Sequence, residues 1–176
     1  MVNNIDFGDS PFAVLAKYQK FPPVSLKEIA GELGLNVYSK DLGPEISGQI
    51  MRDRVRGGKS GFAIFVNSND HPNRQRFTLA HEIAHYILHR DLIEGGVIDD
   101  TMYRSSLSNY YEMQANKMAA DILMPIRLVK QYMTKYTNVG QLAQAFEVSK
   151  GAMEIRLKSV GQITPPLPKQ QPAQPI

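Results

Sequence analysis

The segment from Arg76 to Arg90, RFTLAHEIAHYILHR, constrains the fold more than any other part of the sequence. Its apolar residues recur at spacings of three and four: Phe77, Ala80, Ala84, Ile87 and Leu88. This periodicity predicts an amphipathic helix that begins near residues 70–72 and ends at about Asp91. The helix carries three of the four histidines of the chain on one stripe: His81, His85 and His89.

His81 and His85 have the spacing of two ligands of one metal ion. Helical residues four apart lie one turn above each other, with about 5–6 Å between their Cβ atoms. Zn–N bonds of about 2.0–2.1 Å fit two imidazoles placed in this way. Glu82 lies about 100° further round the helix, too far to be an easy third ligand but near enough to act on a water molecule at the metal. His-Glu-x-x-His is the motif of zinc peptidases, in which the glutamate is the general base.

The alternative for this motif is an exposed helix face that carries unrelated histidines. Chance would produce the motif in on the order of one in 250 chains of this composition, so we favour the metal site. His89 is a separate case, because three imidazoles over two turns span about 12 Å, too far for one ion. We interpret His89 as a polar residue near a helix end, where a cation suits the helix dipole; a role beside the metal, as a supporting group or an electrophile, is the alternative.

A catalytic zinc ion takes three protein ligands and keeps one position open. The chain has no cysteine, so the third ligand must be a histidine or a carboxylate. The extended motif with a glycine and a histidine at positions 88 and 91 is excluded, because Leu88 and Asp91 stand there. The remaining candidates are the carboxylates that follow: Asp91, Glu94, Asp99, Asp100 and Glu112.

Glu112 is the favoured third ligand, because it lies on a small and largely apolar face of a second predicted helix, 108–124. That face is formed by Ala115, Asn116, Ala119, Ala120 and Leu123. A carboxylate is costly to bury on such a face unless it is paired or bound to a metal, and alanines let a partner helix approach closely. The alternative is a partly exposed glutamate with no ligand role.

The two helical segments RFTLAHEIAHYILH and EMQANKMAADILMP together closely resemble the ImmA/IrrE metallopeptidase family. The family pattern is R-F-T-x-A-H-E-x-x-H-x-x-x-H followed by E-x-x-A-N-x-F-A-A-x-L-L-M-P, and it pairs here with Arg76 to Pro125. The segments SLKEIAGELGLNVY (25–38) and LAQAFEVSKGAMEIRLKSVG (142–161) are also similar, so the resemblance spans roughly 25–161. Met118 stands where the family often has phenylalanine, a swap that a core tolerates.

The resemblance implies a thermolysin-like, gluzincin-like endopeptidase with one zinc ion per chain. It implies that His81, His85 and Glu112 are the ligands and that Glu82 is the base. It also implies that the substrate is a protein, a helix-turn-helix transcriptional repressor of the XRE type, in a mobile element or a stress response.

Zinc needs help from the protein to stabilise the oxyanion of the tetrahedral intermediate. The sequence offers several candidates for this role or for orienting a ligand: Asn116, His89, Tyr103, Arg104, Tyr110 and Tyr111. The strand predicted at 61–67, or its hairpin partner, is a candidate for pairing with an extended substrate backbone.

The predicted fold class is α+β, a mainly helical zincin-like peptidase with a small antiparallel sheet, because helices outweigh strands and the strands cluster near the front. Strands are predicted at 35–39, 46–52 and 61–67, the last two as a hairpin round Gly57 and Gly58. Three parts are expected: a metallopeptidase domain over 1–125, a helix-turn-helix-like helical segment over 126–161, and a disordered Pro/Gln-rich tail over 162–176.

Residues 141–157 support a rival function, since their apolar spacing is that of a helix-turn-helix with Lys150, Arg156 and Lys158 on or near the second helix. The chain would then be a DNA-binding or regulatory protein with a structural or sensing zinc ion. Glu147 at the turn and a net charge of only +3 argue against direct binding to nucleic acid. An intact Glu82 argues against a pure binding site. We expect a helical hairpin that packs on the peptidase or docks a protein.

The N-terminal twenty residues have neither a basic segment nor a long apolar run, so no signal peptide is expected. No stretch approaches 18 apolar residues, so no contact with a membrane is expected either. The expected location is the cytoplasm.

Overall fold

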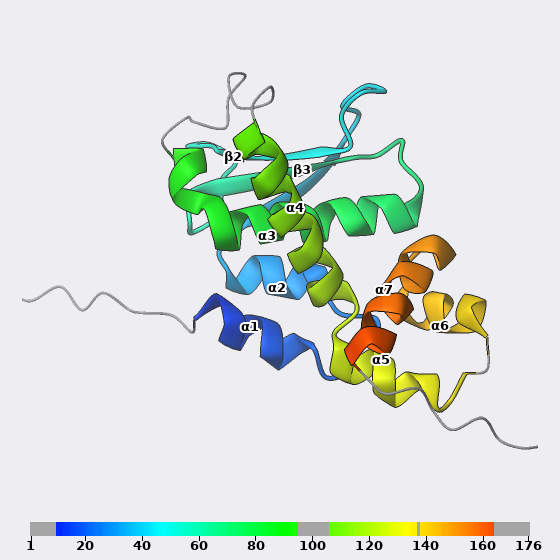
Figure 1. Ribbon diagram of the computed structural model, residues 1–176. Coiled ribbons are helices and arrows are strands. Elements are labelled where there is room, and N and C mark those ends of the chain that lie inside the picture. Colours follow the sequence, from blue (N-terminus) through cyan, green and yellow to red (C-terminus); the bar gives the residue numbers. More distant parts are fainter. Residues whose placement is uncertain (1–9, 95–105, 137, 164–176) are drawn as a thin grey trace, which may run out of the picture.

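The computed structural model describes residues 10–94, 106–136 and 138–163. In these ranges the chain forms helices round one small sheet (Figure 1), which is the predicted α+β class. The N-terminal half contains α1 (Pro11–Tyr18), α2 (Leu26–Glu32), β1 (Asn36–Lys40), β2 (Gly48–Arg52) and β3 (Phe62–Asn67). The other half contains α3 (Pro72–Glu94), α4 (Ser106–Leu123), α5 (Ile126–Met133), α6 (Val139–Phe146) and α7 (Lys150–Ile163).

The sheet has the strand order β1-β3-β2 and is mixed, which corrects the prediction of an antiparallel sheet. β2 and β3 form the predicted antiparallel hairpin, with Ile50 opposite Ile64. β1 pairs with the other edge of β3 in parallel, with Val37 opposite Ile64. A local sequence pattern can predict a hairpin, because the two strands and their turn are consecutive in the chain. The same pattern does not indicate in which direction a strand such as β1 pairs with the other edge of β3.

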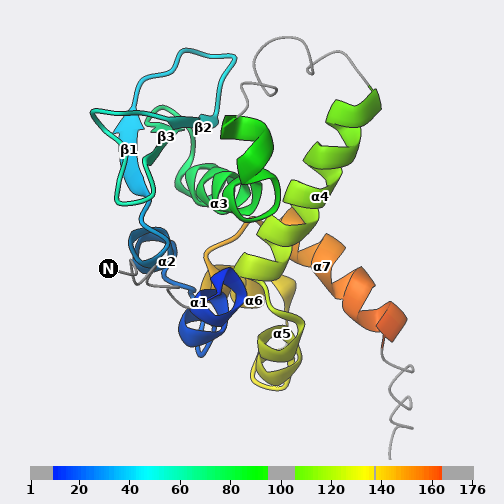
Figure 2. The same cartoon turned by 90° about the vertical axis from the view of Figure 1, so that its left-hand side faces the viewer.

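β3 is the centre of the core, and all six of its residues, FAIFVN, are buried. A continuous apolar run of this kind suits a strand that is covered on both faces and paired on both edges. Figure 2 shows α3 end-on between the sheet and α4. Small residues line both helices where they meet: Ala80 and Ala84 on α3, and Ala115 and Ala119 on α4, are fully buried. This close approach brings the histidines of α3 (His81, His85 and His89) within reach of side chains on α4.

The C-terminal helices pack on the same core. Leu128, Phe146 and Met153 belong to one buried cluster with Ile83 and Ile122. The boundary at residue 125 between a peptidase domain and a helical segment therefore crosses a continuous core, and the division into separate domains stays a prediction. Residues 162 and 163 end α7, and the rest of the predicted tail, 164–176, lies outside the described residues.

Two ion pairs attach the C-terminal helices to α3 and α4. Arg156 is 8% exposed; its Nε donates to the carbonyl of Met124 and its Nη2 lies 2.6 Å from Asp121 Oδ1. Glu147 takes the left-handed conformation (φ 52°) between α6 and α7. Its Oε2 lies 3.5 Å from Nη1 of Arg76 on α3. None of the helices in the described ranges is both long and apolar enough to cross a bilayer.

Candidate metal centre

Three side chains from α3 and α4 converge on one point. The Nε2 atoms of His81 and His85 are 3.0 Å apart. Glu112 places Oε2 3.3 Å from His81 Nε2 and Oε1 3.1 Å from His85 Nε2. Ligands held tetrahedrally at about 2.0–2.1 Å from a zinc ion stand about 3.3 Å from each other. The spacing of these donors therefore matches that of a metal site, and the group could hold an ion.

The chemistry of the donors also fits a cation. Two ring nitrogens that face each other at 3.0 Å cannot both carry a proton, so at least one lone pair points into the space between them. The contacts of Glu112 with the rings of His81 and His85 hold the pKa of its carboxyl well below its usual range, which keeps it anionic. Burial opposes the charged form of His81, but its hydrogen bond to Glu112 and nearby carboxylates outweigh this and raise its pKa. The carboxylates thus favour a positive charge at this point, either on His81 or on a bound cation.

The other carboxylates considered from the sequence do not join this group. Asp91 is 93% exposed, and Glu94 at the end of α3 is also exposed. Asp99 and Asp100 lie outside the described residues. Over the described ranges, His81, His85 and Glu112 are the only group of three such residues with metal-binding spacing.

Glu82 lies beside the cluster on the face of α3 that meets β2. It is 7% exposed, and it accepts a hydrogen bond from the backbone N–H of Ile50. Burial raises the pKa of its carboxyl, partly offset by the nearby histidines. A general base works best when its pKa lies near the working pH, so this shift suits such a role.

Gly48 lets β2 approach Glu82 this closely. A Cβ atom at Gly48 would lie 2.3 Å from Thr78 Cγ2 and 3.0 Å from the carbonyl oxygen of Phe65. It would also lie 3.5 Å from Oε1 of Glu82. Only glycine fits this position, which the sequence pattern of the strand did not indicate.

His89 lies where the first helical stretch of α3 ends, as predicted, but it is not a cation at an exposed end, because burial lowers the pKa of its ring. It sits at a kink within α3 (φ −131°, ψ 18°), five residues before the end of the helix, and is 4% exposed. Its Nδ1 is 3.1 Å from Nδ1 of His85, and its Nε2 is 3.0 Å from Oε1 of Gln114. Residue spacing does not reveal such a kink, and Gln114 was missed because nothing in its own sequence context marks it.

The remaining candidates are distributed round the centre. Asn116 hydrogen-bonds to His81. The Tyr111 ring meets His89 edge-on with 4.9 Å between centroids, and Tyr110, which is 51% exposed, packs on Tyr111. Tyr103 and Arg104 lie outside the described residues. A role for any of them with an oxyanion stays a prediction.

Several known proteins are similar to this chain. The model of the IrrE N-terminal-like domain matches residues 30–158. The radiation response metalloprotease IrrE of Deinococcus deserti is 37% identical over 90 residues, which cover 49% of this chain and 32% of that protein. Its counterpart in Deinococcus radiodurans is 39% identical over 90 residues, which cover 49% and 27%. The chain therefore spans about a third of the length of these relatives.

A phage protein and a solved structure extend the comparison. "Uncharacterized immunity region protein 2" of Bacillus phage phi105 is 29% identical over 120 residues, which cover 68% of this chain and 71% of that protein. The structure of a Mycobacterium tuberculosis transcriptional regulator matches 92% of this chain and 48% of its own, with a TM-score of 0.57 and 19% identity. At that identity the likeness concerns the fold alone.

Proposed function

Because this chain belongs to the IrrE N-terminal-like domain family, as its two helical motifs predicted, we propose that it is a zinc-dependent endopeptidase of the zincin type. His81, His85 and Glu112 hold the ion, and Glu82 is the general base. The observation that carries the proposal is the convergence of three donors of suitable type and spacing beside a buried glutamate with a raised pKa.

A bound zinc ion would supply Lewis-acid activation of a water molecule and of the scissile carbonyl. Glu82 accepts a proton from the attacking water, whose oxygen forms the new bond to the carbonyl carbon. As the C–N bond breaks, Glu82 donates that proton to the departing nitrogen, so the carboxylate is regenerated. The N–H of Ile50 orients the Glu82 carboxylate for both transfers.

The edge of β2 next to Glu82 is where we propose that the substrate backbone pairs. β3 has neighbours on both sides, so it has no free edge for a substrate, and only its hairpin partner remains of the two candidates from the sequence. The N–H of Ile50 points to Glu82 and therefore away from β3. Backbone groups two residues away on a strand point the same way, so Gly48 and Arg52 present N–H groups along the same edge of β2.

The proposed substrate is a helix-turn-helix repressor of the XRE type, cleaved in the cytoplasm during a stress response or the life cycle of a mobile element. The family resemblance of the two helical motifs supports this, as does the similarity to a phage protein named for an immunity region.

One of the basic residues on which the rival DNA-binding function depends, Arg156, is buried in the core. Arg156 is buried against Asp121 and the carbonyl of Met124, so it cannot reach a phosphate. Lys150 and Lys158 remain exposed, but Glu154 lies 3.9 Å from Lys150. The C-terminal helices therefore support protein docking better than DNA binding.

The test is incubation of the purified chain with XRE-type helix-turn-helix repressors from the same genome, with cleavage followed by mass spectrometry. The proposal predicts cleavage that a chelator abolishes and that zinc restores. A metal-free protein that cleaves equally well would contradict it.

A further inference from the structure

A row of hydrogen-bonding groups leads away from the candidate metal centre through the kink in α3. His85 Nδ1 faces His89 Nδ1 at 3.1 Å, and His89 Nε2 faces Gln114 Oε1 at 3.0 Å. Both rings are buried, at 7% and 4% exposure. Their partners are therefore the groups that determine where each ring carries its proton.

The oxygen of Gln114 determines which group donates and which accepts in each hydrogen bond of this row. A neutral imidazole has one N–H and one lone pair. Because Oε1 of Gln114 is an acceptor, His89 carries its proton on Nε2 and presents a lone pair at Nδ1. His85 must then carry its proton on Nδ1, which leaves the lone pair on Nε2, the atom that faces His81 and Glu112.

The opposite direction is incompatible with metal binding. If the amide nitrogen of Gln114 faced His89, each proton would move to the other ring nitrogen. His85 Nε2 would then carry a hydrogen towards His81 and Glu112. The orientation of one amide on α4 thus decides whether a histidine on α3 has a free lone pair.

We propose that His89 and Gln114 are positioning residues that hold His85 in the tautomer and orientation required of a metal ligand. The proposal rests on the function proposed above, in which His85 is a ligand. It adds two residues that touch neither metal nor substrate. Partners of this kind change metal affinity by about 10–100-fold in metalloproteins.

His81 provides an internal contrast. Its Nδ1 is buried, and within the described ranges it has no hydrogen-bond partner. His81 instead contacts Asn116. Within the described ranges, His85 therefore has a hydrogen-bonding partner at its Nδ1 atom, whereas His81 has none there.

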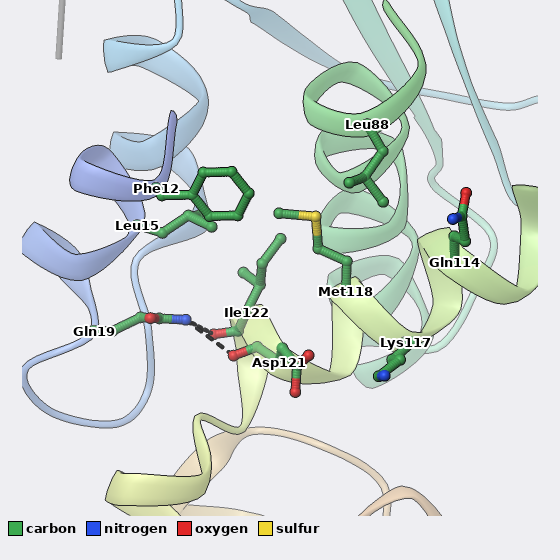
Figure 3. Close-up of a pocket in the computed structure, with 9 residues that line it drawn as sticks. All are labelled: Phe12, Leu15, Gln19, Leu88, Gln114, Lys117, Met118, Asp121 and Ile122. Carbon is green, nitrogen blue, oxygen red and sulfur yellow. Dashed lines mark hydrogen bonds between the residues drawn. The ribbon is translucent and has the colours of Figure 1, made fainter. Parts of the chain in front are cut away.

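Gln114 can be replaced without repacking the core. Figure 3 shows it at the edge of a pocket of about 450 Å³ between α1, α3 and α4, whose apolar wall includes Phe12, Leu15 and Leu88. Its side chain is only partly buried. Variants at position 114 therefore test the network independently of folding, which a variant of the buried His89 does not.

The test is the zinc dissociation constant of the full chain, measured by competition with a chromophoric chelator. Gln114→Leu removes the acceptor, and we expect zinc binding to weaken by about tenfold. Gln114→Glu keeps the acceptor and the length of the side chain, and we expect binding at least as tight as that of the wild type. His89→Leu should weaken binding by about 10–100-fold, and His89→Gln, which can offer an oxygen to His85, should recover part of it.

A second readout is the His85 Nδ1 proton in NMR spectra of the zinc-loaded protein. A hydrogen bond to His89 protects this proton from exchange, so it should be visible in the wild type and in Gln114→Glu. It should be lost by exchange in His89→Leu. His71→Leu, the same change at the exposed histidine before α3, is the matched control and should alter neither readout.

The outcomes separate this inference from the proposed function. Wild-type zinc affinity in both Gln114→Leu and His89→Leu, with binding lost in Glu112→Ala, would overturn the positioning role alone. A wild-type chain that binds no zinc, or a Glu112→Ala variant that binds it as tightly, would overturn both.

Discussion

At the scale of single residues, the roles proposed for Glu82 and its neighbours are separable, because the proposed base and the proposed ligands are different groups. Glu82→Gln removes the base and leaves His81, His85 and Glu112 in place. We expect kcat/KM for the repressor to fall by about 10³-fold, with zinc content and thermal midpoint close to those of the wild type. Mass spectrometry of the products and metal analysis check this. Cleavage at the wild-type rate would exclude Glu82 as the base.

As a proposed metal ligand, Glu112 would contribute through the ion, so its loss should be visible in stability as well as in binding. Glu112→Ala should abolish stoichiometric zinc binding and remove the rise in thermal midpoint that zinc gives the wild type, since a ligand stabilises the state that binds it. Glu94→Ala, at an exposed carboxylate near the end of α3, is the matched control and should change neither. Full zinc occupancy in Glu112→Ala would place the third ligand elsewhere.

The sequence predicted the three donors and named His89 and Asn116 as candidates beside them, but it indicated neither Gln114 nor the kink in α3, for a physical reason. A spacing of four on a helix brings His81 and His85 together by geometry alone, and a carboxylate on an alanine face has few alternatives to a buried partner. The role of His89 depends on a kink at that residue, and that of Gln114 depends on how α3 crosses α4. Neither feature is encoded in local periodicity.

At the scale of elements, the contact of β2 with α3 holds Glu82 beside the candidate metal centre, and it depends on Gly48. Gly48→Ala should destabilise the fold by about 1–3 kcal/mol, because the new methyl group overlaps Thr78 Cγ2. It should also lower peptidase activity, since β2 must move away and take the Ile50 N–H from Glu82. Urea unfolding and peptide hydrolysis measure the two effects.

Gly31 offers the matched control for this change. A Cβ atom there meets nothing within 4 Å, and the residue lies inside α2. Gly31→Ala should stabilise the chain by about 0.4–1 kcal/mol and leave activity unchanged. A Gly48→Ala variant as stable and active as Gly31→Ala would show that β2 does not need this close approach.

The helices and strands could be predicted wherever the sequence pattern that determines them lies within a short stretch of the chain. The periodicity of α3, the alanine face of α4 and the hairpin of β2 and β3 all follow from short-range patterns. The parallel pairing of β1 with β3 does not, since either edge and direction would bury Val37 similarly. That choice is made by the tertiary packing of α2 and α3 below the sheet.

At the scale of the whole molecule, the C-terminal helices are attached to the candidate peptidase through Arg156 and Glu147, and their exposed lysines face outwards. Lys150→Glu with Lys158→Glu should impair cleavage of the intact repressor by about tenfold or more, while a short peptide across the cut site should be hydrolysed as before. The same pair of changes at Lys27 and Lys59, exposed on the N-terminal half, should affect neither reaction.

Arg156 is unsuitable for that experiment because its buried side chain contacts Asp121 and the carbonyl of Met124, and its replacement would loosen α7. Binding of duplex DNA by the wild type, with an affinity that falls steeply with salt and is lost in the Lys150 and Lys158 variant, would favour the DNA-binding function. We expect no such binding.

The central claim is that His81, His85 and Glu112 together hold one metal ion, and anomalous diffraction from crystals of the zinc-loaded chain tests it most directly. Data collected on either side of the zinc absorption edge should show a single peak per chain, about 2.0–2.2 Å from Nε2 of both histidines and from an oxygen of Glu112. A peak that lies elsewhere, or zinc-loaded crystals with no peak between these three side chains, would contradict it.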